Sequence, residues 1–322
     1  MNIREFKGTL NTWGQNHIPF LFIIDFEMKC PMAFRLSEID PSTIQYNFRG
    51  FTNISKTAKR SSPDIRINPI SFENYKQRFD KVMFHLRRGD SFLANLTIAT
   101  EFTSTLTLEE IFSGSQAKYK LLYKNEFVCF SPEPFVRIID NTISSFPMKG
   151  TIDAIIPNAR EIILTNKKEL SEHITIVDLI RNDLSQIAHF VEVPDFRYIE
   201  EVKTHDKILL QVSSKITGQL PENYLSNIGE ILCKLLPAGS VSGAPKVKTV
   251  EIIREAEESN RGYYTGVCGY FDGYNLDSGV MIRFIENNDG NLLYRSGGGI
   301  TAQSNDLEEY QEAIKKIYVP VD

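Results

Sequence analysis

The sequence predicts an α+β protein, and two features of its 322 residues support this fold class. Helical and strand-like patterns are interleaved irregularly, without the strict alternation of βαβ units and without a repeat of fixed period. No linker rich in Pro, Gly or Ser divides the chain, so a single domain covering residues 1–322 is preferred over two. Within it, residues 1–70 carry fewer recognisable patterns than the rest.

The first half of the chain predicts one long helix and several strands. Residues 19–24 form an apolar run that Asp25 interrupts, which is typical of a buried strand and far too short for a membrane span. From Phe72 to Gly89, apolar residues recur at helical spacing, and Gly89 supplies a stop signal. Runs rich in β-branched and aromatic residues predict strands at 92–102, 118–130 and 136–146.

The second half predicts further helices before the pattern returns to strands. Apolar stripes indicate helices at 166–185, 223–236 and 244–256. Strands are expected at 263–271, 280–286 and 292–295. The last two are joined by Asn287-Asn288-Asp289-Gly290, which predicts a hairpin. A final helix is expected at 306–317.

Composition excludes several classes of function. The net charge is −5 and no stripe of Lys and Arg is present, which argues against nucleic-acid binding. The four cysteines are far apart and form no CxxC pair, so neither a disulfide framework nor a zinc site is indicated, and a reducing cytoplasm is expected. No signal-peptide pattern begins the chain. No HExxH motif or serine nucleophile elbow supports a hydrolase.

Glycines and carboxylates crowd together in the carboxyl-terminal third. Three successive glycines, 297–299, directly follow a predicted strand and would let the backbone approach a ligand closely, although a flexible turn explains them equally well. Glu309 and Glu312 share one face of the last predicted helix, with Lys316 one turn further on. Two carboxylates on one face suit magnesium, but an exposed ion pair with the lysine is the simpler interpretation.

Three other segments also leave two interpretations open. Glu172 lies at the edge of the apolar face of its helix, whose end at 182–183 is typical of a terminal hydrogen-bond network. The segment Ser240-Val-Ser-Gly-Ala-Pro-Lys246 puts small residues ahead of a helix amino terminus, which favours anions or simply caps the helix. Lys149 ends a strand beside a glycine, a setting in which a lysine is ordinarily a surface residue.

Taken together, seven blocks stand in the order of one known family. They span roughly residues 72–318 and are Ser131-Pro-Glu-Pro-Phe, Pro147-Met-Lys-Gly-Thr, Glu172 through Asp183, Gly239-Ser-Val-Ser-Gly-Ala-Pro-Lys246, Arg261-Gly-Tyr-Tyr-Thr-Gly, Ile282-Arg, and Ser296-Gly-Gly-Gly through Glu312. In this order they resemble the chorismate-utilising enzymes, which include anthranilate synthase component I, aminodeoxychorismate synthase component I, and the isochorismate and salicylate synthases.

The resemblance implies a fold and a set of site residues. The fold is a two-layer β-sandwich core flanked by helices, with the active site near the junction of the layers. Magnesium is expected on Glu172 and Glu312, with Glu309 binding it directly or through a water. Substrate carboxylates and other substrate groups are expected to meet Arg295, Lys316, the amides of Gly297, Gly298 and Gly299, and the side chains of Ser240, Thr151, Gln211 and Arg283.

The residue at position 149 implies which reaction is most similar. Anthranilate synthases usually carry alanine in this slot, while aminodeoxychorismate synthases carry lysine, so the chain most resembles aminodeoxychorismate synthase component I. In that reaction Lys149 would add to ring C2 of chorismate as the C4 hydroxyl leaves, with Glu133 as its proton donor. Ammonia then attacks C4 and expels the lysine. The attack requires a neutral Lys149, so desolvation or nearby cations are expected to lower its pKa.

The resemblance also implies partners and alternatives. The product would serve 4-aminobenzoate and folate biosynthesis. Because the chain has no Cys-His glutaminase, ammonia is expected from a separate glutamine amidotransferase subunit or from free ammonium. Gln211 stands where most relatives have histidine, and a glutamine can donate a hydrogen bond but cannot carry a proton charge. The alternatives are anthranilate synthase component I and a non-catalytic chorismate-binding subunit.

Overall fold

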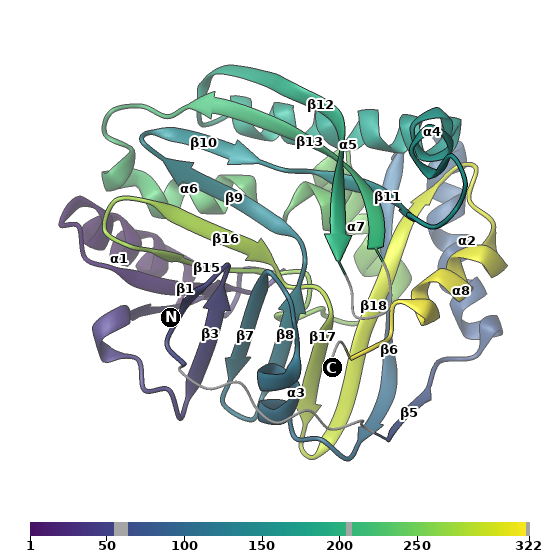
Figure 1. The fold of residues 1–322 in the computed structure, drawn as a ribbon, viewed down its shortest axis with the longest axis horizontal. Helices are drawn as coiled ribbons and strands as arrows, with labels where there is room; N and C mark the ends of the chain where they lie inside the picture. Colours follow the sequence, from purple (N-terminus) through teal and green to yellow (C-terminus); the bar gives the residue numbers. More distant parts are fainter. Residues whose placement is uncertain (55–63, 204–207, 320–322) are drawn as a thin grey trace.

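Two antiparallel sheets form the centre of the molecule (Figure 1). The computed structural model describes residues 1–54, 64–203 and 208–319. The first sheet has the spatial order β11 (Met148–Asp153), β13 (Ile208–Gln219), β10 (Thr142–Ser145), β9 (Pro134–Ile139), β16 (Leu276–Val280), β15 (Val267–Phe271), β1 (Phe20–Ile24) and β2 (Met32–Arg35), with β12 (His189–Lys203) paired to β13.

The second sheet contains the triple-glycine segment. Its spatial order is β14 (Gly243–Ala244), β6 (Leu93–Ser104), β18 (Asn291–Thr301), β17 (Phe284–Asn288), β8 (Phe127–Ser131), β7 (Tyr119–Tyr123), β3 (Ile44–Phe48) and β4 (Phe51–Thr52), with β5 (Ile65–Asn68) paired to β6. β17 and β18 form the predicted hairpin, in register from Phe284 opposite Arg295 to Asn288 opposite Asn291.

Apolar side chains fill the space between the sheets and cover their outer faces. Leu21 and Ile23 of the first sheet pack between the layers against Tyr46 and Leu121 of the second. Burying each such aliphatic side chain stabilises the fold by about 1.5–3 kcal/mol. Outside the first sheet lie α1 (Ile3–Gln15), α5 (Lys167–Ser185) and α6 (Ile228–Leu235). Outside the second lie α2 (Phe72–Arg88), α7 (Lys246–Glu257), α8 (Asp306–Lys315) and α3 (Leu108–Gly114).

This arrangement confirms the predicted α+β class and the two-layer sandwich. The helix boundaries follow their capping residues. Ser71 accepts a hydrogen bond from the amide of Asn74 at the start of α2, and Gly89 ends that helix in the left-handed conformation, with φ of 79°. Likewise, the side chain of Asn166 accepts from the amide of Glu169 at the start of α5.

Several predicted elements differ in detail. Residues 118–130 and 136–146 each form two strands rather than one, and the predicted strand 263–271 begins only at Val267. The predicted helix 223–236 is a short 3₁₀ turn, Tyr224–Asn227, followed by α6. The long hairpin of β12 and β13 was not predicted, because β12 is mostly exposed and its pairing has three register shifts, so no apolar period marks it. Helices α1, α3 and α4 (Ala159–Thr165) were not predicted either.

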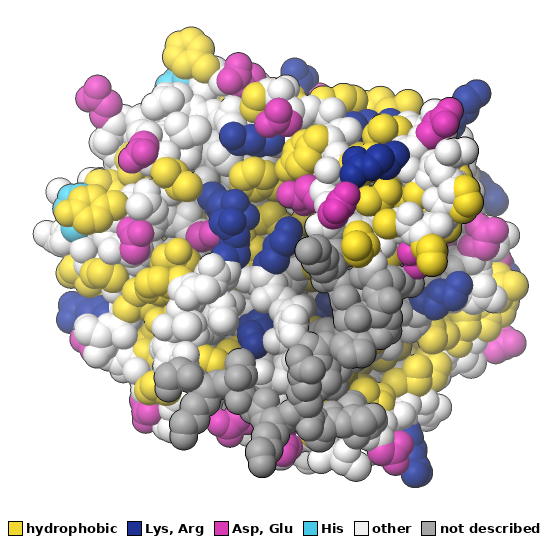
Figure 2. Space-filling view, viewed as in Figure 1, with side chains coloured by type: hydrophobic (Ala, Val, Ile, Leu, Met, Phe, Trp, Pro, Cys, Tyr) yellow, Lys and Arg dark blue, Asp and Glu magenta, His cyan; other side chains and the backbone are white. Residues whose placement is uncertain are grey.

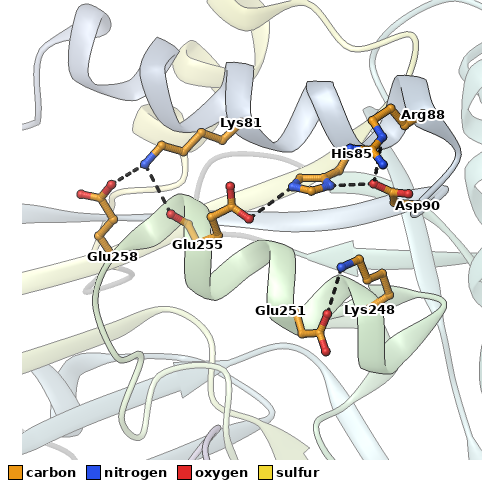
Figure 3. Close-up of polar contacts among 8 residues, drawn as sticks. All are labelled: Lys81, His85, Arg88, Asp90, Lys248, Glu251, Glu255 and Glu258. Carbon is orange, nitrogen blue, oxygen red and sulfur yellow. Dashed lines mark hydrogen bonds and ion pairs between the residues drawn. The ribbon is translucent and has the colours of Figure 1, made fainter.

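Two groups of surface charges are explained by contacts within the fold. Figure 2 shows Lys and Arg side chains gathered near the middle of one face, over β9 and β16. Arg137 on β9 lies 3.4 Å from the buried Asp277 on β16, and Arg49 lies 3.3 Å from the same carboxylate. Figure 3 shows the second group, which joins α2 to α7: His85 lies between Asp90, at 2.8 Å, and Glu255, at 3.3 Å.

Candidate active site

Lys149 lies in an irregular stretch of β11. The register of β11 with β13 shifts between Met148 and Thr151, and Gly150 within this stretch has φ of 81°. Such bulges redirect side chains. The side chain of Lys149 is 28% exposed, and its Nζ lies 2.8 Å from Oε2 of Glu172. Lys149 is therefore a partly buried, paired group and not an ordinary surface lysine.

Glu172 belongs to a carboxylate pair on α5. Glu169 lies one turn before it, and the carboxylate of Glu169 is 3.1 Å from the position that a Cβ on Gly150 would take. Glu172 itself is 8% exposed. Burial alone would lower the pKa of Lys149, but the charges of Glu172, Glu169 and Glu312 outweigh it, so the pKa lies above its usual value. This contradicts the lowered pKa expected from the sequence, because nearby carboxylates favour the ammonium form.

A second set of charges lies on α8 and just after it. Glu309 is buried and accepts a 2.7 Å hydrogen bond from the hydroxyl of Ser304. Lys316 lies 2.7 Å from Oε1 of Glu312 and donates a 2.9 Å hydrogen bond to the carbonyl of Gly297. Burial lowers the pKa of Lys316, only partly opposed by Glu312. The exposed ion pair that was the simpler interpretation is thus wrong for Glu309, which is inside the fold.

The three glycines bring the two sets together. Gly297 to Gly299 are part of β18 and pair with residues 95–97 of β6, so they form a strand and not a flexible turn. A methyl group on Gly298 would lie 3.5–3.7 Å from polar atoms of Lys316, Glu309 and Glu312, and one on Gly299 would lie 3.2 Å from Nζ of Lys149. Because Gly299 lacks a Cβ atom, Lys149 can approach the strand closely, while Lys316 lies at ordinary contact distance from Gly298.

One edge of β18 is open at these glycines. The pairing of β18 with β17 ends at Arg295, and in the described ranges no other strand pairs with that edge beside residues 297–299. In an antiparallel strand, successive amides point to opposite edges. Binding of a substrate carboxylate by these glycine amides stays a prediction.

Glu133 lies immediately before β9. Its Oε1 accepts a short hydrogen bond from the hydroxyl of Ser240. Burial raises the pKa of Glu133, opposed by Ser240, by Arg283 and by both Lys149 and Lys316. A carboxyl group that holds its proton more tightly than usual is suited to protonate a leaving group. The charges of both lysines therefore act on Glu133.

Other predicted substrate residues have different surroundings. Both Nε and Nη2 of Arg295 contact Oε1 of Glu286, at 2.9 and 2.6 Å, so this guanidinium is engaged within the chain instead of offering the expected free fork. Thr151 and Gln211 are cross-strand partners on β11 and β13. Arg283 lies between β16 and β17 with φ of 55°, and its buried Nε has no hydrogen-bond partner. Contacts of these four with substrate stay predictions.

The carboxylates fit magnesium by the chemistry of their donor atoms. Glutamate oxygens are hard ligands, and magnesium needs few of them because it keeps waters or substrate oxygens. Within the described ranges, however, no three His, Cys, Asp or Glu side chains are grouped closely enough to hold a metal as they stand. The ammonium groups of Lys149 and Lys316 contact Glu172 and Glu312 instead. A metal would have to displace or reorient these contacts.

A cleft of about 660 Å³ opens onto Glu172. Its wall includes Phe92, Ile174, Pro245 and Gln303, so it runs between α5 and the loop that follows β18. Clefts of roughly 300–1,000 Å³ are typical of small-molecule sites. Among the candidate site residues in the described ranges, Glu172 alone lines this cleft, while Lys149 has its own exposed fraction of 28%.

Comparison with known proteins shows the family of the chain. A family model described as chorismate binding enzyme matches residues 36–322. The chain belongs to the chorismate-binding enzymes. It is 48% identical to an uncharacterized PabA-like protein of Pasteurella multocida over the full length of both chains. Aminodeoxychorismate synthase component 1 of Bacillus subtilis is 31% identical over 78% of this chain, which spans 55% of that protein.

A solved structure of another chorismate-utilising enzyme has a similar fold. The chain superposes on anthranilate synthase component I from Streptococcus pneumoniae with a TM-score of 0.68 and 25% identity, covering 80% of this chain and 59% of that one. The chain thus spans little more than half the length of these larger relatives. No helix in the described ranges is long and apolar enough to cross a membrane.

Sequence reasoning missed Glu169 as a member of this candidate site. The signal was present, because Glu169 and Glu172 have the same spacing as Glu309 and Glu312. It was overlooked because only the structure shows that Gly150 and Lys149 lie against both carboxylates of the first pair.

Proposed function

We propose that this chorismate-binding enzyme makes 4-amino-4-deoxychorismate from chorismate and ammonia. One observation carries the proposal: Lys149, the residue that would form the covalent intermediate, is held by Glu172 beside the glycine strand and within electrostatic reach of Glu133. The 31% identity to an aminodeoxychorismate synthase component 1 supports the same reaction. The product would serve 4-aminobenzoate and folate biosynthesis.

The proposed reaction has two displacement steps. The neutral amine of Lys149 attacks ring C2, the double bond shifts, and the C4 hydroxyl leaves as water with a proton from Glu133. Ammonia then attacks C4, the double bond shifts back, and the C2–N bond to Lys149 breaks. The extra proton on the new C4 nitrogen is released to solvent, and Glu133 takes up a proton before the next turnover. Lys149 must lose a proton before it attacks, because Glu172 favours its ammonium form.

Magnesium is part of the proposal. Glu172, Glu309 and Glu312, with Glu169 as a fourth candidate, would hold the ion through carboxylate oxygens. When bound, it would hold the ring carboxylate of chorismate and polarise the ring. The open edge of β18 and Lys316, whose Nζ lies 2.9 Å from the carbonyl of Gly297, would receive the other carboxylate.

Ammonia would come from a glutamine amidotransferase subunit or from free ammonium. The chain can therefore be tested alone by supplying an ammonium salt. Incubation with chorismate, magnesium and ammonium should give 4-aminobenzoate only after a separate lyase is added. Direct release of anthranilate would instead assign the chain to the anthranilate synthase reaction.

Intact-mass analysis tests the covalent step. Without ammonium, wild-type protein should gain the mass of chorismate less water, and Lys149→Ala should gain none and lose turnover. Lys149→Arg keeps a cation beside Glu172 but should also form no adduct. Lys248→Ala is a matched control, because Lys248 is an exposed lysine on α7 whose ammonium pairs with Glu251. An adduct on Lys149→Ala would refute the assigned nucleophile.

A further inference from the structure

A small cavity lies beside Glu133, separate from the larger cleft. Its volume is about 30 Å³, and its wall is largely apolar, formed by side chains such as Ile180, Leu184 and Val280. Two carboxylates, those of Glu133 and Asp183, line it together with Ser240. A cavity needs roughly 10–15 Å³ to hold a water, and a water there needs two to four polar partners. This cavity meets both conditions.

Asp183 is the group that the proposed reaction does not use. It lies in the last turn of α5, and its side chain is only 9% exposed. Nζ of Lys246 lies 2.6 Å from its Oδ2 and also donates a 2.9 Å hydrogen bond to the carbonyl of Leu235. Burial raises the pKa of Asp183, opposed by the charge of Lys246. Lys246 is 16% exposed, so the pair extends from the cavity to solvent.

Gly239 and Ser240 separate the two acids. A methyl group on Gly239 would lie 3.5 Å from Oδ2 of Asp183 and 3.0 Å from a methyl carbon of Leu179. The next residue, Ser240, donates its hydroxyl hydrogen bond to Glu133. The two carboxylates therefore lie on either side of one short turn, with the cavity beside it.

We infer that Asp183 and Lys246 exchange protons between solvent and Glu133 through water held in this cavity. The inference rests on the proposed function, in which Glu133 is the acid. To protonate the substrate hydroxyl, Glu133 must touch the ring, and the ring then covers Glu133 on that side. The cavity offers a route that the substrate does not block.

The proton balance of this route is simple. The ammonium of Lys246 gives a proton to the Asp183 carboxylate, Asp183 passes it to the water, and the water gives one to the Glu133 carboxylate. Solvent replaces the proton on Lys246. Only one proton moves inward. The charged groups facing the route are Lys246 on the Asp183 side and Arg283, Lys149 and Lys316 on the Glu133 side.

Two variants interrupt the route by different means. Asp183→Asn keeps the size of the side chain but cannot pass a proton, while Gly239→Ala keeps both Asp183 and Lys246 and adds a methyl group to the wall between them. In each, kcat with ammonium should fall by about 10-fold or more. The KM for chorismate should stay near the wild-type value, and the solvent deuterium isotope effect on kcat should increase. Glu251→Gln, an exposed change on α7, should match wild type.

Stability is measured in parallel, because Asp183→Asn leaves Lys246 without its counter-charge. The double change Asp183→Asn with Lys246→Met removes both charges, and it should regain stability without regaining kcat. A fall in kcat with an unchanged isotope effect would overturn the inference, as would wild-type kcat in both single variants. Loss of the proposed function is a different result, namely wild-type protein that forms no aminodeoxychorismate at all.

Discussion

The site contains two groups, each made of one lysine and two glutamates. The two glutamates are three residues apart in both groups, but their surroundings differ. On the α5 side, Lys149 pairs with Glu172, and Glu169 lies one turn away. On the α8 side, Lys316 pairs with Glu312, and Glu309 takes the place of Glu169 by lying one turn earlier. Both lysine side chains are 28% exposed. Their carboxylate partners differ, since Glu172 is 8% exposed and Glu312 is 54% exposed.

This difference in the partners gives the two lysines opposite electrostatics. The pKa of Lys149 is raised, because the buried Glu172 and its neighbours outweigh desolvation. The pKa of Lys316 is lowered, because the exposed Glu312 compensates desolvation less well and the charges of Lys149 and Arg283 add to the effect. Equal spacing in the sequence therefore does not give equal chemistry. Burial of the acceptor decides how strongly a charge pair acts.

The largest effect is expected from the two paired glutamates. Glu172→Gln removes the buried partner of Lys149 and a proposed magnesium ligand, so product formation should fall by roughly 100-fold or more. Glu312→Gln removes a partner that solvent already screens, and the fall should be several-fold smaller at saturating magnesium. Initial rates over a magnesium titration measure both. Equal losses in the two variants would show that burial does not distinguish the two groups.

The two carboxylate pairs show which parts of the site could be predicted from sequence alone. The spacing of Glu309 and Glu312 was visible and led to a metal hypothesis, and the same spacing at Glu169 and Glu172 was available but not used. What the sequence could not show is that a bulge at Gly150 turns Lys149 toward α5. Such contacts join segments that are distant along the chain, so no local pattern reports them.

The fold shows the same limit. Strand β6 and helix α2 were predicted because each buries one continuous face. The β12–β13 hairpin was missed because β12 is held by its pairing with β13, and its own sequence has no regular apolar period that would predict a strand. The substrate contact expected of Arg295 stays a prediction. Its ion pair with Glu286 on the neighbouring strand was not predicted, because the hairpin register sets it and the segment around Arg295 does not show it.

Replacing Gly298 or Gly299 of β18 by alanine tests the difference between the Lys316 group and the Lys149 group. At Gly299 the methyl would lie 3.2 Å from Nζ of Lys149, so the amine must move, and kcat should fall by about 10-fold or more. At Gly298 the nearest polar atoms would be 3.5–3.7 Å away, which is ordinary contact, and the effect should be smaller. Adduct formation by intact mass separates the two, because only Gly299→Ala should slow it. A slower adduct in Gly298→Ala alone would reverse the assignment of the lysines.

The smallest effect concerns how the free energy of unfolding changes with pH. The contributions of Lys149 and Lys316 to this change should have opposite signs. The folded-state pKa of Lys149 is above the usual 10.5, so its stabilising effect is complete below that pH and is lost as the pH rises through the folded-state pKa. The folded-state pKa of Lys316 is below 10.5, so the unfolded chain binds more protons in the interval between them. Wild-type stability relative to Lys316→Met should therefore increase as the pH rises toward 10.5.

Urea unfolding of wild type, Lys149→Met and Lys316→Met between about pH 8 and pH 11 measures these differences, at about 1.4 kcal/mol per unit of pKa shift. Subtracting each variant from wild type cancels the titration of the buried tyrosines, which all three proteins share. Lys248→Met, at an exposed position, controls for the loss of a lysine side chain as such. Two curves with the same slope would mean that Glu172 does not hold Lys149 more firmly than Glu312 holds Lys316. Opposite slopes would place the stronger ion pair on the α5 side, where the nucleophile is proposed.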